Sequence, residues 1–241
     1  MRSRSNSLLE ALAAFTADDA RLIEEYDRQF RALKRLYASV NDPELFLKLV
    51  VLNALLSYQL SMRGEEYWEK FSDFFSSGRG LEEFPEFLRL YNRRFIGAKL
   101  KRFEKALRCV EELFKEGVEP LAEDLSAFVG RLATCMGQKE SAKTVVFAAK
   151  MFLYGYRVAF GREPHGIEGV EIPLDSRLSK LLPSVKGWRE LAEVVGIPPV
   201  HLDAVVWVPM GMSPAEVKSL PLPLRSKVER LLEVLKGLRS R

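Results

Sequence analysis

Histidine and cysteine are scarce in this chain, with two of each among 241 residues. Cys109 and Cys135 lack Cys-x-x-Cys spacing, and His165 and His201 are far apart in the sequence. Zinc sites and iron–sulfur clusters need clustered ligands, so we expect no metal, no disulfide framework and two lone thiols. A nucleophile activated by histidine is equally disfavoured. Any chemistry is therefore expected to use lysine and carboxylate side chains.

Long apolar runs are also missing. The most apolar segment, residues 45–60, is interrupted by Lys48 and Asn53, and a membrane span needs about eighteen consecutive apolar residues. The N-terminus carries two arginines but no apolar stretch that ends in a small-residue cleavage site, so no secretion signal is predicted. We therefore expect a cytoplasmic protein without a membrane partner.

A strong charge of either sign is absent. Lysine and arginine total 37 against 33 acidic residues, a net charge of +4, and 47% of the residues are hydrophobic. This composition predicts a soluble globular protein with a sizeable core. The mild positive charge permits a polyanionic partner without requiring one. Charged residues also greatly outnumber Asn and Gln, which is typical of heat-adapted proteins.

Helical periodicity is what the sequence does contain, and no alternating strand pattern extends beyond a few residues. Apolar residues over 7–39 predict two amphipathic helices that meet near Thr16, a candidate N-cap. Other helices are expected from Glu44 to Leu60, from Gly64 to the SSGRG loop at 76–80, over 96–107, on both sides of a connector near 136–138, and over 187–195, 199–208 and 221–239. The predicted fold class is all-α.

The helix predicted from Ile96 combines an apolar stripe with basic residues. Ile96, Leu100 and Phe103 follow helical spacing along one face. The basic residues on its other faces are Lys99, Lys101, Arg102, Lys105 and Arg108. A solvated face and a surface that contacts phosphates both explain this pattern, and the sequence leaves both open.

The segment SAKTVVFAAKMFLYGY, residues 141–156, places two lysines in an otherwise apolar helix. Lys143, Phe147 and Lys150 are spaced +4 and +3, so they share one face. Repulsion between two ammonium groups and partial removal from water both favour a neutral, nucleophilic amine. Two lysines that reach solvent at a helix edge would explain the same pattern.

Asp175, in the segment EIPLDSR, is the second candidate for chemistry. It follows an extended Ile-Pro-Leu and precedes the helical SRLSKLL, so its carboxylate is predicted to cap a helix N-terminus. Capping alone explains this residue. The alternative is that the carboxylate acts together with Lys143.

These motifs together resemble the archaeal 8-oxoguanine DNA glycosylases, the AGOG family of the helix–hairpin–helix base-excision repair enzymes. The core of the resemblance is the segment 141–156 followed by IPLDSRL, with Asp175 placed 32 positions after Lys143. Other matching motifs occur in the expected order: DRQFRAL at 27–33, LNALLSYQL at 52–60 with GEEYWEKF at 64–71, and GIPPVHLDAVVW at 196–207. The resemblance spans about residues 25–210.

The family implies one glycosylase domain over 1–241, built from two interleaved helical subdomains with an active-site cleft between them and a helix–hairpin–helix at about 126–156. It implies a monomer that removes 8-oxoguanine from duplex or single-stranded DNA through a lysine Schiff base and then cleaves 3′ to the abasic site by β-elimination. It implies no metal and no organic cofactor.

The resemblance also implies roles for individual residues. Lys143 resembles the Schiff-base nucleophile, and Asp175 resembles the catalytic carboxylate. Phe147 and Trp207 look like the aromatic pair that stacks on the flipped base. The residues that resemble the set recognising the edge of that base are Gln29, Trp68, Lys150 and Asp203.

One segment departs from the pattern of the superfamily. Its hairpin usually contains Gly-Val-Gly, whereas the connector CMGQKES has only Gly137, so hairpin amides that bind phosphate are less strongly predicted. Lys139 lies in this connector and competes with Lys143 for the nucleophile role, although the spacing to Phe147, Lys150 and Asp175 favours Lys143.

Two other classes of protein stay open. A non-catalytic helical nucleic-acid-binding protein would keep its DNA affinity after Lys143→Gln and would cut DNA at no lesion. A helical interaction scaffold would have no DNA affinity even at low salt.

Overall fold

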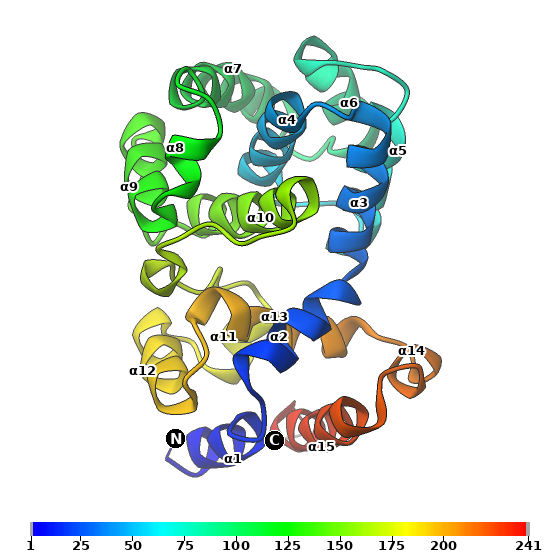
Figure 1. Cartoon of the computed structure of the whole chain (residues 1–241), viewed down its shortest axis with the longest axis vertical. Helices are drawn as coiled ribbons and strands as arrows, with labels where there is room; N and C mark the ends of the chain where they lie inside the picture. Colours follow the sequence, from blue (N-terminus) through cyan, green and yellow to red (C-terminus); the bar gives the residue numbers. More distant parts are fainter. Residues whose placement is uncertain (1, 240–241) are drawn as a thin grey trace. The chain divides into compact units, whose positions relative to one another are not determined.

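A computed structural model describes residues 2–239, in which all regular structure is helical and strands are absent. The predicted all-α class is confirmed. The chain forms two compact units (Figure 1). One unit is the continuous segment Arg28–Val170, and the other combines the residues up to Asp27 with those from Glu171 onward. We call them the central unit and the terminal unit.

The central unit is organised around one long helix, α10 (Lys143–Phe160), which packs against helices α3, α4 and α9 (Figure 1). Almost every residue of α10 from Val145 to Tyr156 is buried, as expected for a helix that is apolar on all sides. The other elements of this unit are α3 (Arg28–Val40), α4 (Pro43–Leu56), α5 (Gly64–Phe75), η1 (Leu81–Glu83), α6 (Phe84–Tyr91), α7 (Ile96–Leu113), α8 (Glu119–Ala122), α9 (Leu125–Met136) and η2 (Ile167–Gly169).

Two glycines let α10 occupy this position. A Cβ at Gly155 would lie 2.7 Å from Cδ2 of Leu47, so a larger residue there would force the Leu47 side chain to move. Gly137 has φ +61° and ends α9 in the left-handed conformation that favours glycine. The short connector that follows leads directly into α10, which gives the predicted helix–connector–helix arrangement.

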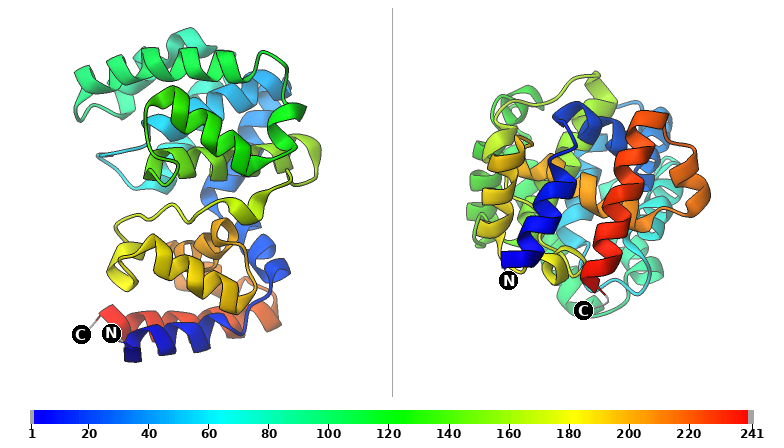
Figure 2. Two further views of the ribbon diagram at one scale, coloured as in Figure 1. Left: turned by 90° about the vertical axis from the view of Figure 1, so that its left-hand side faces the viewer. Right: turned by 90° about the horizontal axis from the view of Figure 1, so that it is seen from below.

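The terminal unit joins the two ends of the chain. Its helices are α1 (Arg2–Leu12), α2 (Ala17–Glu25), α11 (Leu178–Leu181), α12 (Val185–Val195), α13 (Pro199–Gly211), α14 (Pro214–Lys218) and α15 (Leu222–Arg239). Helices α1 and α15 lie side by side and run in opposite directions (Figure 2). Helix α2 packs against α13, where Nδ1 of His201 lies 2.6 Å from Oε1 of Glu24.

No single helix in the described range is long and apolar enough to cross a membrane. Helices α12 and α13 reach that length and apolarity only together, as a pair bent by 97°.

Several predicted boundaries were right and others were wrong. Thr16 caps α2 as predicted, because its side chain accepts a hydrogen bond from the Asp19 amide. The segment 7–39 lies on three helices rather than two, since the chain leaves the helical path after Glu25. The helix predicted to reach Leu60 ends at Leu56. The short helix α11 lies within the segment SRLSKLL that was predicted to be helical, whereas α6, α8 and α14 were not predicted as separate elements, since short helices carry little periodic pattern.

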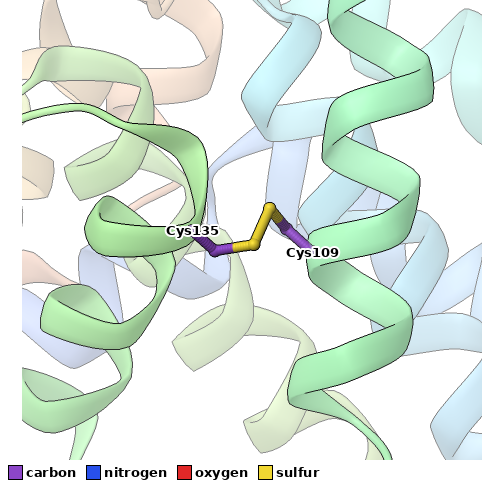
Figure 3. The surroundings of a disulfide bond; sticks show 2 residues. All are labelled: Cys109 and Cys135. Atoms are coloured by element: carbon purple, nitrogen blue, oxygen red, sulfur yellow. A yellow bond between two sulfur atoms is a disulfide. The ribbon is translucent and has the colours of Figure 1, made fainter.

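Cys109 of α7 and Cys135 of α9 form a disulfide, with an S–S distance of 2.05 Å and a Cα–Cα distance of 5.7 Å (Figure 3). The prediction of two lone thiols is therefore wrong. The reason is tertiary: α7 and α9 pack against each other, and a sequence separation of 26 residues does not reveal that adjacency.

Removing this disulfide should lower stability measurably. The double variant Cys109→Ala, Cys135→Ser should unfold with about 3 kcal/mol less free energy than the wild type, because opening a loop of this length returns conformational entropy to the unfolded chain. Urea denaturation without reductant measures the difference. Reductant should shift the wild-type midpoint to that of the variant and leave the variant unchanged. Coincident curves under both conditions would contradict the prediction.

Candidate active site

Lys143 is the first residue of α10, and its side chain is exposed. The residue before it, Ala142, provides no side-chain cap, while Val145 and Val146 just after it are buried in the core. The backbone at this point is therefore held by its apolar neighbours, and the amine stays accessible to a substrate.

Lys150 lies in a different environment on the same helix. Only 2% of this residue is exposed, and its Nζ lies 5.3 Å from the ring centroid of Tyr154. The idea of two lysines that reach solvent at a helix edge is therefore wrong for Lys150. A buried lysine side chain is suited to contact a ligand that is itself shielded from water.

Trp68 of α5 and Phe147 of α10 meet edge to face, with ring centroids 6.0 Å apart and an interplanar angle of 80°. Trp68 is fully buried and also contacts Phe71 at 5.2 Å. Phe147 is only half-buried. The structure thus brings two of the predicted base-binding residues together and leaves part of the Phe147 ring accessible, one turn after Lys143.

Gln29 is buried on α3, and an ion pair fixes its neighbourhood. Arg28 donates from Nε and Nη2 to the two carboxylate oxygens of Glu69 on α5, each at 2.8 Å. These hydrogen bonds lower the pKa of Glu69 and raise that of Arg28. Gln29 follows Arg28 in the sequence, and Trp68 precedes Glu69. The ion pair therefore holds α3 and α5 together next to both residues.

Asp175 lies in the terminal unit, and both of its carboxylate oxygens are engaged. Oδ1 accepts hydrogen bonds from the amides of Arg177 at 2.8 Å and Leu178 at 2.9 Å, which confirms the predicted capping contacts. Oδ2 accepts a hydrogen bond from Nε1 of Trp207 at 3.0 Å. This half-buried carboxylate is therefore held in a single orientation.

Trp207 and Asp203 lie one turn apart on α13. The Trp207 ring is half-buried, and the guanidinium of Arg177 lies 4.5 Å from its centroid. Asp203 is buried. Asp175, Trp207 and Asp203 therefore lie in the terminal unit, and the remaining predicted residues lie in the central unit: Gln29, Trp68, Lys143, Phe147 and Lys150.

Two basic residues of α7 have structural roles that the sequence pattern does not reveal. Lys99 is completely buried, and its Nζ donates to Oδ1 of Asn92, to the Asn92 carbonyl at 3.5 Å and to the Gln59 carbonyl at 3.4 Å. The sequence does contain one signal for the burial of Lys99. It precedes Phe103 by one helical turn, so the two residues share a face of α7, and both are buried.

Arg102 connects three segments of the central unit. Its Nε donates to the Leu55 carbonyl at 2.8 Å, and its Nη2 donates to Oε1 of Gln138 at 2.8 Å and to Oγ1 of Thr144 at 2.9 Å. It therefore ties the connector and the first turn of α10 to the end of α4. The expectation that all five basic residues occupy outer faces is wrong for Lys99 and Arg102; the exposed ones are Lys101, Lys105 and Arg108.

The buried Lys99 should make stability depend on pH. Burial, together with the charge of Arg94, lowers the pKa of Lys99 from 10.5 to about 8. Between these values the unfolded chain holds a proton that the folded protein has lost, so the free energy of unfolding rises with pH across this window, by at most about 3 kcal/mol.

Comparison with a Lys99→Met variant isolates this contribution from other titrating groups. Urea denaturation at several pH values from about 7.5 to 10.5 should show the wild type gaining stability relative to the variant as pH rises. A constant difference between the two proteins would contradict the lowered pKa.

The chain is similar to known proteins of one family. Residues 9–236 match the model of the AGOG family, described as N-glycosylase/DNA lyase. A protein named N-glycosylase/DNA lyase from Thermococcus kodakarensis is 37% identical over 223 residues, which covers 86% of this chain and 84% of that protein. One of the same name from Methanococcus maripaludis is 34% identical over 222 residues, covering 86% and 88%.

A solved structure is also similar. It is the crystal structure of Pa-AGOG, an 8-oxoguanine DNA glycosylase from Pyrobaculum aerophilum, in complex with 8-oxoguanosine. The TM-score is 0.78 with 24% sequence identity, and the match covers 95% of this chain and 97% of that one. This similarity confirms the expected fold, that of a helical glycosylase of the helix–hairpin–helix type.

Proposed function

The chain belongs to the AGOG family of N-glycosylase/DNA lyases, and from this premise we propose that it removes 8-oxoguanine from DNA and then cleaves the strand. The observation that supports the proposal most directly lies on α10. The exposed amine of Lys143 stands one turn before the half-buried Phe147, which contacts Trp68. A nucleophile next to an accessible aromatic ring suits an enzyme that must hold a flipped base while it attacks the attached sugar.

Base recognition, in this proposal, depends on stacking and on buried polar groups. Flipping the base costs a few kcal/mol of stacking and pairing energy, which contacts in the pocket must offset. Phe147 and Trp207 stack on the base, while the edge is read by Gln29, Trp68, Lys150 and Asp203. The hydrogen on N7 distinguishes 8-oxoguanine from guanine, and the side-chain carbonyl of Gln29 or a main-chain carbonyl accepts it.

The proposed chemistry uses Lys143 and Asp175. The amine of Lys143 bonds to C1′ as the glycosidic bond breaks, and the departing base takes the bonding electron pair and the proton that the attacking nitrogen releases. The carboxylate of Asp175 stabilises the positive charge that develops on the sugar. Opening of the sugar ring transfers the remaining nitrogen proton to O4′ and gives an imine, and water then takes a C2′ proton as the 3′ phosphate leaves with its bonding electron pair. These steps balance without a metal or an organic cofactor.

The proposed partner is DNA that carries 8-oxoguanine, either duplex or single-stranded. The protein is proposed to act as a monomer with a single glycosylase domain. The exposed Lys101, Lys105 and Arg108 of α7, together with basic residues of α15, provide positive charge for phosphate contacts. Affinity should therefore fall as salt concentration rises.

The proposal is tested by incubating the wild-type protein with a duplex that contains one 8-oxoguanine and reducing the mixture with borohydride. We expect released base, a strand cut 3′ to the lesion and a covalent protein–DNA band, all missing with undamaged DNA. Base release without a trapped band would remove the lysine Schiff base from the mechanism. Binding without release of any lesion would favour the non-catalytic nucleic-acid-binding alternative.

A further inference from the structure

Helix α10 begins with the proposed nucleophile, yet no side chain next to it in the sequence caps this end. Ala142, at the N-cap position, offers no side-chain hydrogen bond to the amides of the first turn. In the same unit, α4 and α9 each begin after a capping aspartate, Asp42 and Asp124, whose carboxylate accepts from two amides. Apart from apolar packing, only contacts from other segments can therefore fix the first turn of α10, on which Lys143 lies.

The guanidinium of Arg102, from α7, supplies such a contact. Its Nη2, which carries two hydrogens, donates to Oγ1 of Thr144 at 2.9 Å and to Oε1 of Gln138 at 2.8 Å. Thr144 directly follows Lys143, and Gln138 lies near the start of the connector from α9. One nitrogen atom therefore joins both ends of the segment 138–144.

The same guanidinium is anchored on well-fixed parts of the central unit. Its Nε donates at 2.8 Å to the Leu55 carbonyl, one of the last carbonyls of α4, which lack partners within their own helix. The Gln138 amide donates to the Ala133 carbonyl at 2.9 Å, so Gln138 is itself held to the end of α9. The Tyr58 ring lies beside the guanidinium, with 5.6 Å between Cζ and the ring centroid. Arg102 thus fixes the first turn of α10 relative to α4 and α9.

Arg102 differs in this respect from the other basic residues of α7 that precede and follow it. Lys101, Lys105 and Arg108 are exposed, whereas Arg102 is half-buried and donates three hydrogen bonds within the protein. A guanidinium suits this task, because its planar fork holds several acceptors at fixed angles, which the flexible ammonium group of lysine does not. These contacts indicate a role inside the protein rather than at a phosphate.

We propose that Arg102 is a positioning residue for the reaction: by fixing the turn at Thr144, it holds the Lys143 amine in reach of C1′ of the flipped nucleotide. This inference rests on the proposed function, since it takes Lys143 as the nucleophile. The Lys143 side chain is long and flexible, so the place of its backbone limits where the amine can go. A displacement of about 1 Å reduces a rate on the order of 10²-fold.

The test measures base release in a single turnover at saturating enzyme, which separates binding from chemistry. Arg102→Met keeps an unbranched apolar stem and removes the guanidinium. It should slow release of 8-oxoguanine about 10- to 100-fold, while the dissociation constant for the lesion duplex stays within about threefold of the wild-type value. Borohydride trapping on a duplex with a preformed abasic site should slow by a similar factor, because that step needs the same amine at C1′.

Two substitutions at Thr144 test the hydrogen bond without changing the charge. Thr144→Val keeps the shape of the side chain and removes the acceptor, so it should slow both steps about three- to tenfold. Thr144→Ser keeps a hydroxyl and should match the wild type within about twofold. Since Arg102→Met and Thr144→Val break the same contact, the double variant should be no slower than Arg102→Met alone.

Arg79 provides a control for a general loss of stability. Its Nη1 donates to the Phe74 carbonyl at 3.1 Å and to Oγ of Ser77 at 2.6 Å, and its guanidinium lies 4.2 Å from the Phe74 ring centroid. Arg79→Met should lower the melting temperature, as Arg102→Met also should, yet release base at the wild-type rate. Equal slowing in both variants would assign the effect to weakened folding and overturn the proposal.

Each contradictory result is distinct. Wild-type protein that releases no 8-oxoguanine and forms no trapped band contradicts the proposed function itself. With an active wild type, an unimpaired Arg102→Met variant overturns the positioning role alone. Weaker DNA binding with an unchanged rate at saturation overturns it as well, because it would make Arg102 a phosphate contact. So does slower base release with unchanged trapping at the abasic site, which would connect Arg102 with base recognition instead.

Discussion

The Lys143→Gln variant should bind lesion-bearing DNA as the wild type does and release at least about a thousandfold less base in a single turnover. Glutamine keeps a polar side chain at the exposed first position of α10 and removes only the amine that the proposed mechanism uses as the nucleophile. Folding should be unaffected, because the buried residues that anchor this turn, Val145 and Val146, stay in place. The expected loss therefore belongs to the chemical step.

Borohydride trapping and base release measure this effect together. The covalent band should vanish in Lys143→Gln, and melting temperature and DNA affinity should match the wild type. Lys139→Gln is the matched control, since Lys139 is an exposed lysine in the adjoining connector. A band that persists in Lys143→Gln but disappears in Lys139→Gln would assign the nucleophile to Lys139.

The Asp175→Asn variant should slow base release on the order of 10²- to 10³-fold, with DNA affinity unchanged. The amide oxygen of asparagine can still accept the hydrogen bonds from the Arg177 and Leu178 amides, so the turn at the start of α11 should survive. What disappears is the negative charge that, in the proposed mechanism, stabilises the developing sugar cation. Unchanged turnover would remove Asp175 from the mechanism.

Asparagine also changes a second contact, which needs its own control. Its NH₂ group cannot accept the hydrogen bond that Trp207 donates to Oδ2 of Asp175. Trp207→Phe removes that bond but keeps the carboxylate and an aromatic ring. If charge is what matters, Trp207→Phe should be far more active than Asp175→Asn; equal losses would assign the effect to orientation of the carboxylate.

A matched control for the capping role exists elsewhere in the chain. Asp42 caps α4 by accepting hydrogen bonds from the Glu44 and Leu45 amides, the same arrangement that Asp175 makes. Asp42→Asn should retain wild-type excision. A comparable loss in Asp42→Asn would show that weakened capping alone impairs the enzyme.

Local features of this protein can be predicted from its sequence. Helical periodicity predicts the all-α class, and the caps at Thr16 and Asp175 follow from side chains that can bond the nearest free amides. The central position of α10 agrees with a segment that is apolar on every side. Such features depend on neighbours a few residues away, so the sequence contains all the information they require.

Features that depend on distant neighbours cannot be predicted in this way. Lys99 and Arg102 have the sequence pattern of surface residues, yet Lys99 bonds Gln59, and Arg102 bonds Leu55 and Thr144, all forty or more residues away. The Cys109–Cys135 disulfide depends on the packing of α7 against α9, and the short helices follow from contacts rather than from pattern.

The sequence by itself thus predicts the long helices, the caps and the family to which the lysine and aspartate motifs belong. The tertiary structure decides which charged side chains are buried, which aromatic rings are in contact and which loops share a hydrogen-bonding partner. The physical reason is that the groups surrounding a buried side chain belong to segments that are distant in the sequence. Hydrogen bonds such as those of Arg102 exist only once those segments have packed.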